Sequence, residues 1–285
     1  MIVTRSAEAQ RRRGVGTSWA PTVLMSLAIL LALLPFAWAF LTSVKFQHQI
    51  YAFPPEIIPN PFTLFNYASE FTGGLAQGLF NSALVSSCAV ALTVSAGSLA
   101  AYPLARMRFR GSQVVLFTII APMMIPGLVN LVPTYLILSA LGLIDTYLGL
   151  ILLYWVGSLP VAVWILRGFF QTVPRELEEA AVVDGCSRLQ TLTRIILPMS
   201  RPALVTVALL AFLQAWNDFI IASIITTSAE MRTAQLFLYA NIGDVEVNWG
   251  GLMAAALVVS LPVVLLFLFL QRSFVSGLTS GAVKG

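Results

Sequence analysis

Charged residues are scarce in this chain. Only 10% of its 285 residues are charged, whereas 58% are hydrophobic, and the mean hydropathy is +0.88. An ionised side chain at the centre of a bilayer costs about 2.5–3.5 kcal/mol, so a chain that lies mostly in hydrocarbon must avoid charge. The composition therefore excludes a soluble globular domain and predicts a membrane protein.

Lysine is nearly absent. A Walker A phosphate-binding loop requires a lysine that is followed by serine or threonine. The two lysines, Lys45 and Lys284, precede Phe46 and Gly285. The chain therefore has no such loop, and any ATP that drives it must be held by another polypeptide.

Cysteine and histidine are also rare. Cys88 lies in an apolar run, Cys186 lies in a polar segment, and His48 has no cysteine or histidine close to it in the sequence. This spacing predicts neither a disulfide nor a metal site. The sequence also lacks a Ser/His/Asp arrangement and a dinucleotide-binding fingerprint. We therefore predict a non-catalytic chain that binds no cofactor itself.

Six apolar runs are long enough to cross ~30 Å of hydrocarbon. The first also resembles a secretory signal, but it is longer than the roughly 7–15 apolar residues of a signal-peptide core, so we expect it to be retained. The sequence thus predicts an all-α polytopic membrane protein with six transmembrane helices. The predicted spans are residues 19–41, 79–104, 113–138, 145–166, 202–225 and 250–271.

These spans define one transmembrane domain, residues 19–272. It is preceded by the N-terminal segment 1–18 and followed by the tail 273–285, and we expect loops at 43–78 and about 226–249. Of the 16 lysines and arginines, all except Lys45 and Arg232 fall on one side of this map. By the positive-inside rule, both termini and the segment 168–201 are then cytoplasmic.

The net charge of +4 does not indicate a nucleic-acid partner. The basic residues form short clusters beside apolar runs, which is typical of membrane topology and not of a DNA-binding face.

The polar segment between the fourth and fifth apolar runs predicts two short helices that are joined at a glycine. Pro174 suits a first helical position, and the glutamates that follow it are favoured by the helix dipole. Gly185 breaks this helix. Ser187 and Gln190 then form a capping box that starts a second helix, and we expect Pro198 to end it.

The spacing of Glu179-Ala180-Ala181, Gly185 and Leu197-Pro198 in this segment resembles the EAA loop of ABC-importer permeases. In that family the loop is a cytoplasmic coupling helix pair that docks into the ATP-hydrolysing subunit. The paired alanines would leave one helix face almost bare, so another surface could approach closely. The alternative is an amphipathic helix on the membrane surface, which needs neither the alanines nor the fixed spacing. The resemblance implies ATPase docking at Glu179, Ala180, Ala181, Asp184, Gly185, Arg188, Leu197 and Pro198.

Further motifs extend the resemblance over nearly the whole chain, to the carbohydrate branch with its maltose-type permeases. They include Ala100-Ala101-Tyr102, Ala105-Arg106, Trp216-Asn217-Asp218, Trp249-Gly250 and the C-terminal Gly281-Ala282-Val283-Lys284-Gly285. The resemblance implies a prokaryotic inner-membrane complex, embedded in lipid, that imports a carbohydrate. It also implies a second homologous permease subunit, two ATP-binding subunits that hold ATP and magnesium, and an extracytoplasmic substrate-binding protein.

The tail 273–285 has two alternative interpretations. Its small, glycine-rich composition is typical of a flexible end. In maltose-type relatives, however, the corresponding end reaches into the ATPase dimer. The resemblance therefore implies that Gly277, Thr279, Gly281 and Lys284 contact the ATPase.

Four polar residues in the predicted spans are candidates for a substrate pathway. Asn130 lies near the middle of the third span, among prolines and a glycine that should kink the helix. Gln214, Asn217 and Asp218 form a patch toward the outer end of the fifth span. These side chains could line a pathway or could form hydrogen-bonded packing contacts. In maltose-type relatives the other permease supplies the sugar site, which weakens the pathway interpretation.

Three other functions remain open at this point. The same machine could carry a non-sugar solute. An ion-coupled carrier would depend on Asp218, the acidic residue within a predicted span. A membrane scaffold or receptor would use the polar loop to bind some other cytoplasmic protein.

Overall fold

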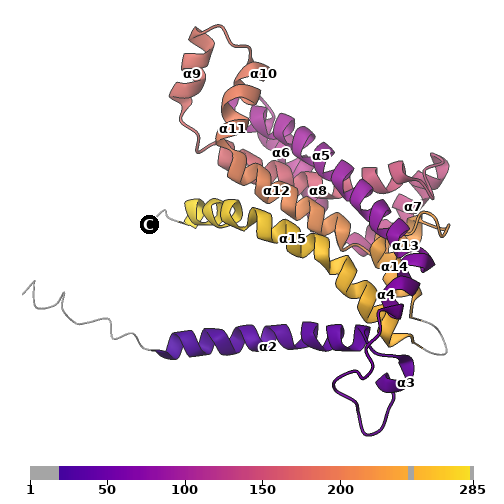
Figure 1. The fold of residues 1–285 in the computed structure, drawn as a ribbon. Coiled ribbons are helices and arrows are strands. Elements are labelled where there is room, and N and C mark those ends of the chain that lie inside the picture. Colours follow the sequence, from indigo (N-terminus) through magenta and orange to yellow (C-terminus); the bar gives the residue numbers. More distant parts are fainter. Residues whose placement is uncertain (1–18, 243–246, 283–285) are drawn as a thin grey trace, which may run out of the picture.

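The computed structural model describes residues 19–242 and 247–282, and it describes side chains up to residue 271. Every regular element in these ranges is a helix (Figure 1). The helices of the outer loops and the long spans are α2 Trp19–Ser43, α3 Gln47–Ile50, α4 Phe65–Glu70, η1 Phe71–Leu75, α5 Ala76–Arg106, α8 Tyr147–Phe170, α14 Ala234–Ala240 and α15 Trp249–Ala282. The broken and short helices are α6 Ser112–Ile120, η2 Ala121–Met124, η3 Gly127–Asn130, α7 Leu131–Ala140, α9 Arg175–Val183, α10 Arg188–Thr191, η4 Leu192–Ile196, α11 Leu197–Met199, α12 Arg201–Trp216 and α13 Ile220–Ile225.

Four helical stretches are long and apolar enough to cross a membrane. They are α2, the continuous stretch Phe65–Arg106, α8, and the part of α15 from Trp249 to Gln271. Two further pairs of helices meet the same test together but are bent, so the number of spans reaches six if each pair crosses once. The predicted all-α membrane fold is confirmed.

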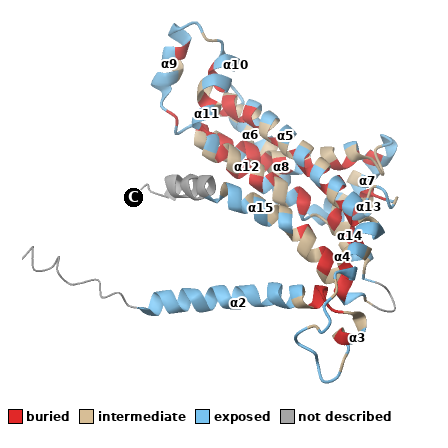
Figure 2. Cartoon of the chain, viewed as in Figure 1, coloured by how far each residue is buried: buried red, intermediate tan, exposed pale blue. Residues whose placement is uncertain are grey.

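The core of the bundle lies where α5, α8 and α12 pack together (Figure 2). Ala101 of α5, Val163 of α8 and Val207 of α12 are almost completely buried there. Gly97 shows how closely α5 and α8 approach, because a Cβ atom at this position would lie 3.1 Å from the Cβ of Ala162. Small residues permit such contacts between membrane helices.

The third apolar run is a broken helix, as its prolines predicted. The helices on either side of the break, residues 112–124 and 127–140, are bent by 96°. Proline removes a backbone donor and clashes with the preceding turn, and Pro122 and Pro126 lie at the two 3₁₀ turns of the break.

Three segments differ from the sequence expectation. The fifth run is not continuous to residue 225, because α12 ends at Trp216 and α13 begins at Ile220. The expected loop 43–78 contains α3, α4 and η1, and the last two continue into α5. The expected loop 226–249 likewise contains α14.

The two ends of the bundle carry different features. The start of α2, the helices α9 to α11 and the C-terminal end of α15 lie at one end, and α3 and α14 lie at the other (Figure 1). At this second end α5 is joined to the segment before α14, since the Asn81 side chain donates to the carbonyl oxygens of Glu230 and Arg232 at 2.7 and 2.8 Å. In addition, the Ser82 hydroxyl accepts from the N–H of Ala234.

Candidate functional site

Helices α9, α10 and α11 form a helical hairpin that extends beyond the bundle (Figure 1). Its turn is at Gly185, whose φ of +82° lies in the left-handed region that favours glycine. The capping box at Ser187 and Gln190 is present. Pro174 is the N-cap of α9 and not its first residue, and Pro198 does not end the second helix, because it lies inside α11.

The expected docking residues divide into two groups. Glu179, Ala180, Asp184, Gly185 and Arg188 are exposed around the tip of the hairpin. At its base, Leu197 is partly buried against the core of the bundle and Pro198 is exposed. The base continues into α12 through a bend of 83°.

The two alanines do not share one free face. Ala180 is exposed, but Ala181 is only 3% exposed and is covered by the chain itself. The small side chain of Ala181 is thus covered within the chain, and α9 packs against α10 of the hairpin. The exposed apolar side chains of α9 are Leu177, Val182 and Val183, at 39%, 64% and 87% exposed, and Val182 lines the cleft between α9 and the end of α5.

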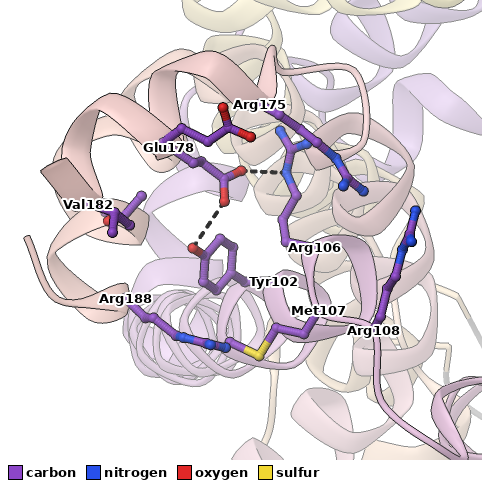
Figure 3. Close-up of a pocket in the computed structure, with 10 residues that line it drawn as sticks. Tyr102, Arg106, Met107, Arg108, Arg175, Glu178, Val182 and Arg188 are labelled. Carbon is purple, nitrogen blue, oxygen red and sulfur yellow. Dashed lines mark hydrogen bonds and ion pairs between the residues drawn. The ribbon is translucent and has the colours of Figure 1, made fainter.

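A cleft of about 500 Å³ separates α9 from the end of α5. Glu178 lies at its centre, with Oε1 2.6 Å from Nε of Arg106 and Oε2 accepting from the Tyr102 hydroxyl at 3.3 Å (Figure 3). Arg106 also donates from Nη2 to the carbonyl oxygen of Val173, immediately before α9. The charged residues that line the cleft are Arg106, Arg108, Arg175, Arg188, Glu178 and Glu179.

The role of Glu178 was not predicted from the sequence. Ala181 follows it by three residues, so the two lie on the same side of α9, and Glu178 is turned toward Arg106 of α5. Its partners Tyr102 and Arg106 were noted in the sequence only as part of a family resemblance.

A second cleft, of about 360 Å³, lies at the broken third run. It brings together two of the predicted pathway residues, Asn130 and Gln214, with Thr134. The remaining lining is apolar or glycine. Gln214 is held in place because its Oε1 accepts from the Ser158 hydroxyl at 3.2 Å.

The other two pathway candidates do not line this cleft. Asn217 caps the C-terminal end of α12. Asp218 is used in packing, since its Oδ2 accepts from the Tyr154 hydroxyl at 2.9 Å and from the backbone N–H of Ala222 at 3.0 Å. These contacts explain why the helix breaks between α12 and α13, because a carboxylate favours the N-terminal turn of the next helix.

Three of the four tail residues that were expected to contact the ATPase lie in α15. The backbone at Gly277, Thr279 and Gly281 is helical, whereas Lys284 lies outside the described residues. The N-terminal arginines also lie outside them.

Curated proteins that resemble this chain are similar over almost its whole length. The trehalose transport system permease protein SugB of Mycobacterium tuberculosis is 37% identical over 276 residues, which cover 94% of this chain and 98% of SugB. The inner membrane ABC transporter permease protein YcjP of Escherichia coli is 36% identical, with 92% and 94% covered. The trehalose/maltose transport system permease protein MalG of Thermococcus litoralis is also 36% identical, with 91% and 94% covered.

Solved structures show the same fold. A chain of a bacterial ABC transporter involved in the import of the acidic polysaccharide alginate superposes with a TM-score of 0.77 at 23% identity, covering 90% of this chain and 95% of that one. Residues 93–280 match the family described as binding-protein-dependent transport system inner membrane component. This match includes the hairpin, both clefts and most of α15, and together with the full-length relatives it shows that the chain belongs to this family of ABC-transporter permeases.

Proposed function

We propose that the chain is the transmembrane permease subunit of an ATP-driven, binding-protein-dependent carbohydrate importer. It forms half of the translocation pathway and couples to a separate ATPase through the α9–α11 hairpin. The partners are a second homologous permease, two ATP-binding subunits that carry ATP and magnesium, and an extracytoplasmic substrate-binding protein. The chain lies in the prokaryotic cytoplasmic membrane, with both termini in the cytoplasm.

The observation that carries this proposal is the hairpin at the basic end of the bundle. Val182 and Val183 are exposed at its tip, and exposed apolar side chains on a projecting element favour contact with another protein. Arg108, Arg175 and Arg188 line the adjacent cleft and could steer an acidic surface of the ATPase toward it.

Two observations support a carbohydrate as the solute. Several relatives are named for trehalose or maltose transport. In this chain, the cleft lined by Asn130, Thr134 and Gln214 offers amide and hydroxyl groups and has no charged residue in its lining. Such groups can pair with sugar hydroxyls, whereas a cationic lining would favour anions.

The transport cycle follows from this arrangement. ATP binding closes the partner subunits, the docked hairpin moves with them, and the bundle opens outward to accept the sugar from the binding protein. Hydrolysis of ATP returns the bundle to the inward-open state. Because η4 contributes the buried Leu192 and Ile196 to the core that joins α5, α8 and α12, movement of the hairpin repacks the membrane helices directly.

Purification in mild detergent tests the proposal. The tagged chain is extracted from its native membrane, and the bound proteins are identified by mass spectrometry. We expect an ATP-binding subunit and a second permease. A Val182→Asp/Val183→Asp variant should lose the ATP-binding subunit and keep the second permease.

The matched control is Ile58→Asp. Ile58 is 76% exposed but lies before α4, at the opposite end of the bundle from the hairpin, so its variant should retain both partners. Recovery of the tagged chain without an ATP-binding subunit, together with solute movement in vesicles without ATP, would show an ion-coupled carrier. Recovery with an unrelated cytoplasmic protein and no transport would show a scaffold.

A further inference from the structure

The two arms of the hairpin are attached to the bundle in different ways. The second arm is anchored by apolar packing, since Leu192 and Ile196 are buried in the core of the bundle. In the first arm, α9, Ala181 is the single buried residue. The position of α9 therefore depends on contacts other than hydrophobic burial, and the polar contacts in the cleft of Figure 3 supply them.

Arg106 and Glu178 form an ion pair, in which Nε and Oε1 are 2.6 Å apart without the alignment of a hydrogen bond. The arginine and glutamate side chains are only 6% and 17% exposed, so water screens their attraction far less than that of a surface pair. Tyr102 lies one helical turn before Arg106 on α5, and its hydroxyl donates to the second carboxylate oxygen. Arg106 also donates to the Val173 carbonyl. Residues of α5 therefore contact α9 at Glu178 and contact the chain just before the start of α9.

Helix α5 connects this pair to the opposite end of the bundle. Its 31 residues extend about 46 Å at 1.5 Å per residue. At the far end, Asn81 and Ser82 hold the segment 230–234 through their side-chain hydrogen bonds. Along its length, α5 packs closely on α8 at Gly97.

We propose that Arg106 and Glu178, supported by Tyr102, are the positioning residues that fix α9 to α5, so that a displacement of α9 moves α5 and the outer segment 230–234 with it. This inference rests on the proposed function and adds the specific path of coupling. The two arms of the hairpin then transmit movement by different contacts. Helix α9 acts on α5 through a charge pair, and the second arm acts through the apolar core.

Charge reversal in the complete transporter tests this inference. Arg106→Glu and Glu178→Arg are each introduced into the complex with its partners, which is reconstituted in proteoliposomes with the binding protein. Because each reversal leaves two like charges in a poorly hydrated site, we expect sugar uptake per ATP hydrolysed to fall at least about tenfold. The double reversal restores opposite charges but not the donor to the Val173 carbonyl, so it should recover uptake per ATP in part, to at least about threefold above either single reversal.

The matched control is a reversal at a fully exposed position of the same helix. Glu176 is exposed, and Glu176→Arg should leave uptake per ATP within about twofold of the parent. Arg106→Lys, which keeps the charge but not the guanidinium geometry, should give an intermediate value. Parental uptake per ATP in both single reversals, or failure of the double reversal to recover, would overturn the inference.

A distance measurement tests, without an ATPase, whether Arg106 and Glu178 fix α9 relative to α5. Spin labels at Val183→Cys and Arg110→Cys, in a background where Cys88 and Cys186 are replaced by serine, report the separation of α9 from the end of α5 in the purified chain. We expect a narrow distribution in the parent, a broad one in each single reversal and a narrow one in the double reversal. If no ATPase binds to the chain, the proposed function fails. Independently of that result, an unchanged distance distribution in the single reversals would overturn the inference that Arg106 and Glu178 position α9.

Discussion

Gly185 shapes the hairpin through its backbone conformation. Its φ is +82°, and a Cβ atom at this position would meet no other atom within 4 Å. Side chains therefore fit in the available space, and the cost of replacing the glycine comes from the left-handed backbone, about 1–2 kcal/mol for a residue other than glycine.

Replacement of Gly185 should disturb the turn in a graded way. We expect Gly185→Asn to be tolerated, because asparagine visits the left-handed region, and Gly185→Val to be worse. The measurement is sugar uptake per ATP in proteoliposomes. Gly168, which is helical and also has open space around it, provides the control, since Gly168→Ala should be neutral or slightly stabilising. Equal effects at the two glycines would contradict a special role for the turn.

Asp145 joins the turn before α8 to the segment after α13. Its Oδ1 accepts from the backbone N–H groups of Thr227 and Ser228 at 2.9 and 3.1 Å, and its own φ is +58°. Burial acts to raise the pKa of Asp145, but these hydrogen bonds outweigh it and hold the pKa below the ordinary 3.8. The stabilisation is therefore complete above pH 3.8 and is lost as the pH falls through the lowered pKa.

Removal of the Asp145 carboxylate should loosen this connection. We expect Asp145→Ala to lower the thermal midpoint in detergent by about 2–4 °C. Asp145→Asn keeps an acceptor oxygen and tolerates a positive φ, so it should lower the midpoint less. An alanine variant as stable as the parent at neutral pH would show that the two hydrogen bonds contribute nothing measurable.

The helices illustrate how much of the fold could be predicted. The apolar runs locate the long helices because a membrane span requires a minimum apolar length. The prolines locate the break in the third run because they disrupt the helix locally. The end of α12 at Trp216 was not predicted, because it depends on Asp218 meeting Tyr154 of α8, which is a contact between distant segments.

In the candidate site, too, the local features could be predicted from the sequence and the contacts between distant segments could not. The capping box and Gly185 are local signals, and they located the hairpin correctly. The burial of Ala181 and the pairing of Glu178 with Arg106 depend on where α9 is placed relative to α10 and to the end of α5. A motif alone does not specify this arrangement, so the face of α9 that remains free for a partner could only be identified in the structure.

Tyr154 and Asp218 should behave as a structural pair. Tyr154 is almost completely buried, so Asp218→Ala would leave its hydroxyl without this acceptor. We expect Asp218→Ala and Tyr154→Phe each to destabilise the protein, with a coupling energy of about 0.5–3 kcal/mol in a double-mutant cycle. Chemical denaturation in detergent is the measurement.

The result at Asp218 also separates two transport mechanisms. In an ion-coupled carrier, Asp218→Asn would abolish transport while the fold remained intact. In an ATP-driven permease, Asp218→Asn retains an acceptor for Tyr154 and should keep sugar uptake within about threefold of the parent.

Many large apolar side chains of the described residues are exposed. In α2, the buried residues are Thr42 and Ser43, and its apolar window has no buried residue within the chain (Figure 2). A helix of this kind is stable only where lipid or other membrane helices cover it. The exposure of α2 therefore agrees with a subunit that is completed by the bilayer and by a second permease.

Deletion of residues 277–285 tests the proposed tail contact in the assembled complex. The described part of α15 continues as a helix to Ala282, so the C-terminal end of α15 lies at the same end of the bundle as the hairpin (Figure 1). We expect the truncated chain to bind the second permease normally and to retain less of the ATP-binding subunit during purification. Unchanged retention would indicate that the tail is not a contact.

The most direct measurement is uptake of labelled sugar by proteoliposomes that contain the purified complex. The panel should include trehalose and maltose, the solutes named for two of the relatives. We predict that uptake requires the binding protein outside the vesicles and hydrolysable ATP on the side of the hairpin. Uptake should stop when ATP is replaced by a non-hydrolysable ATP analogue. Uptake by this chain alone, driven by an ion gradient without ATP, would contradict the proposed function.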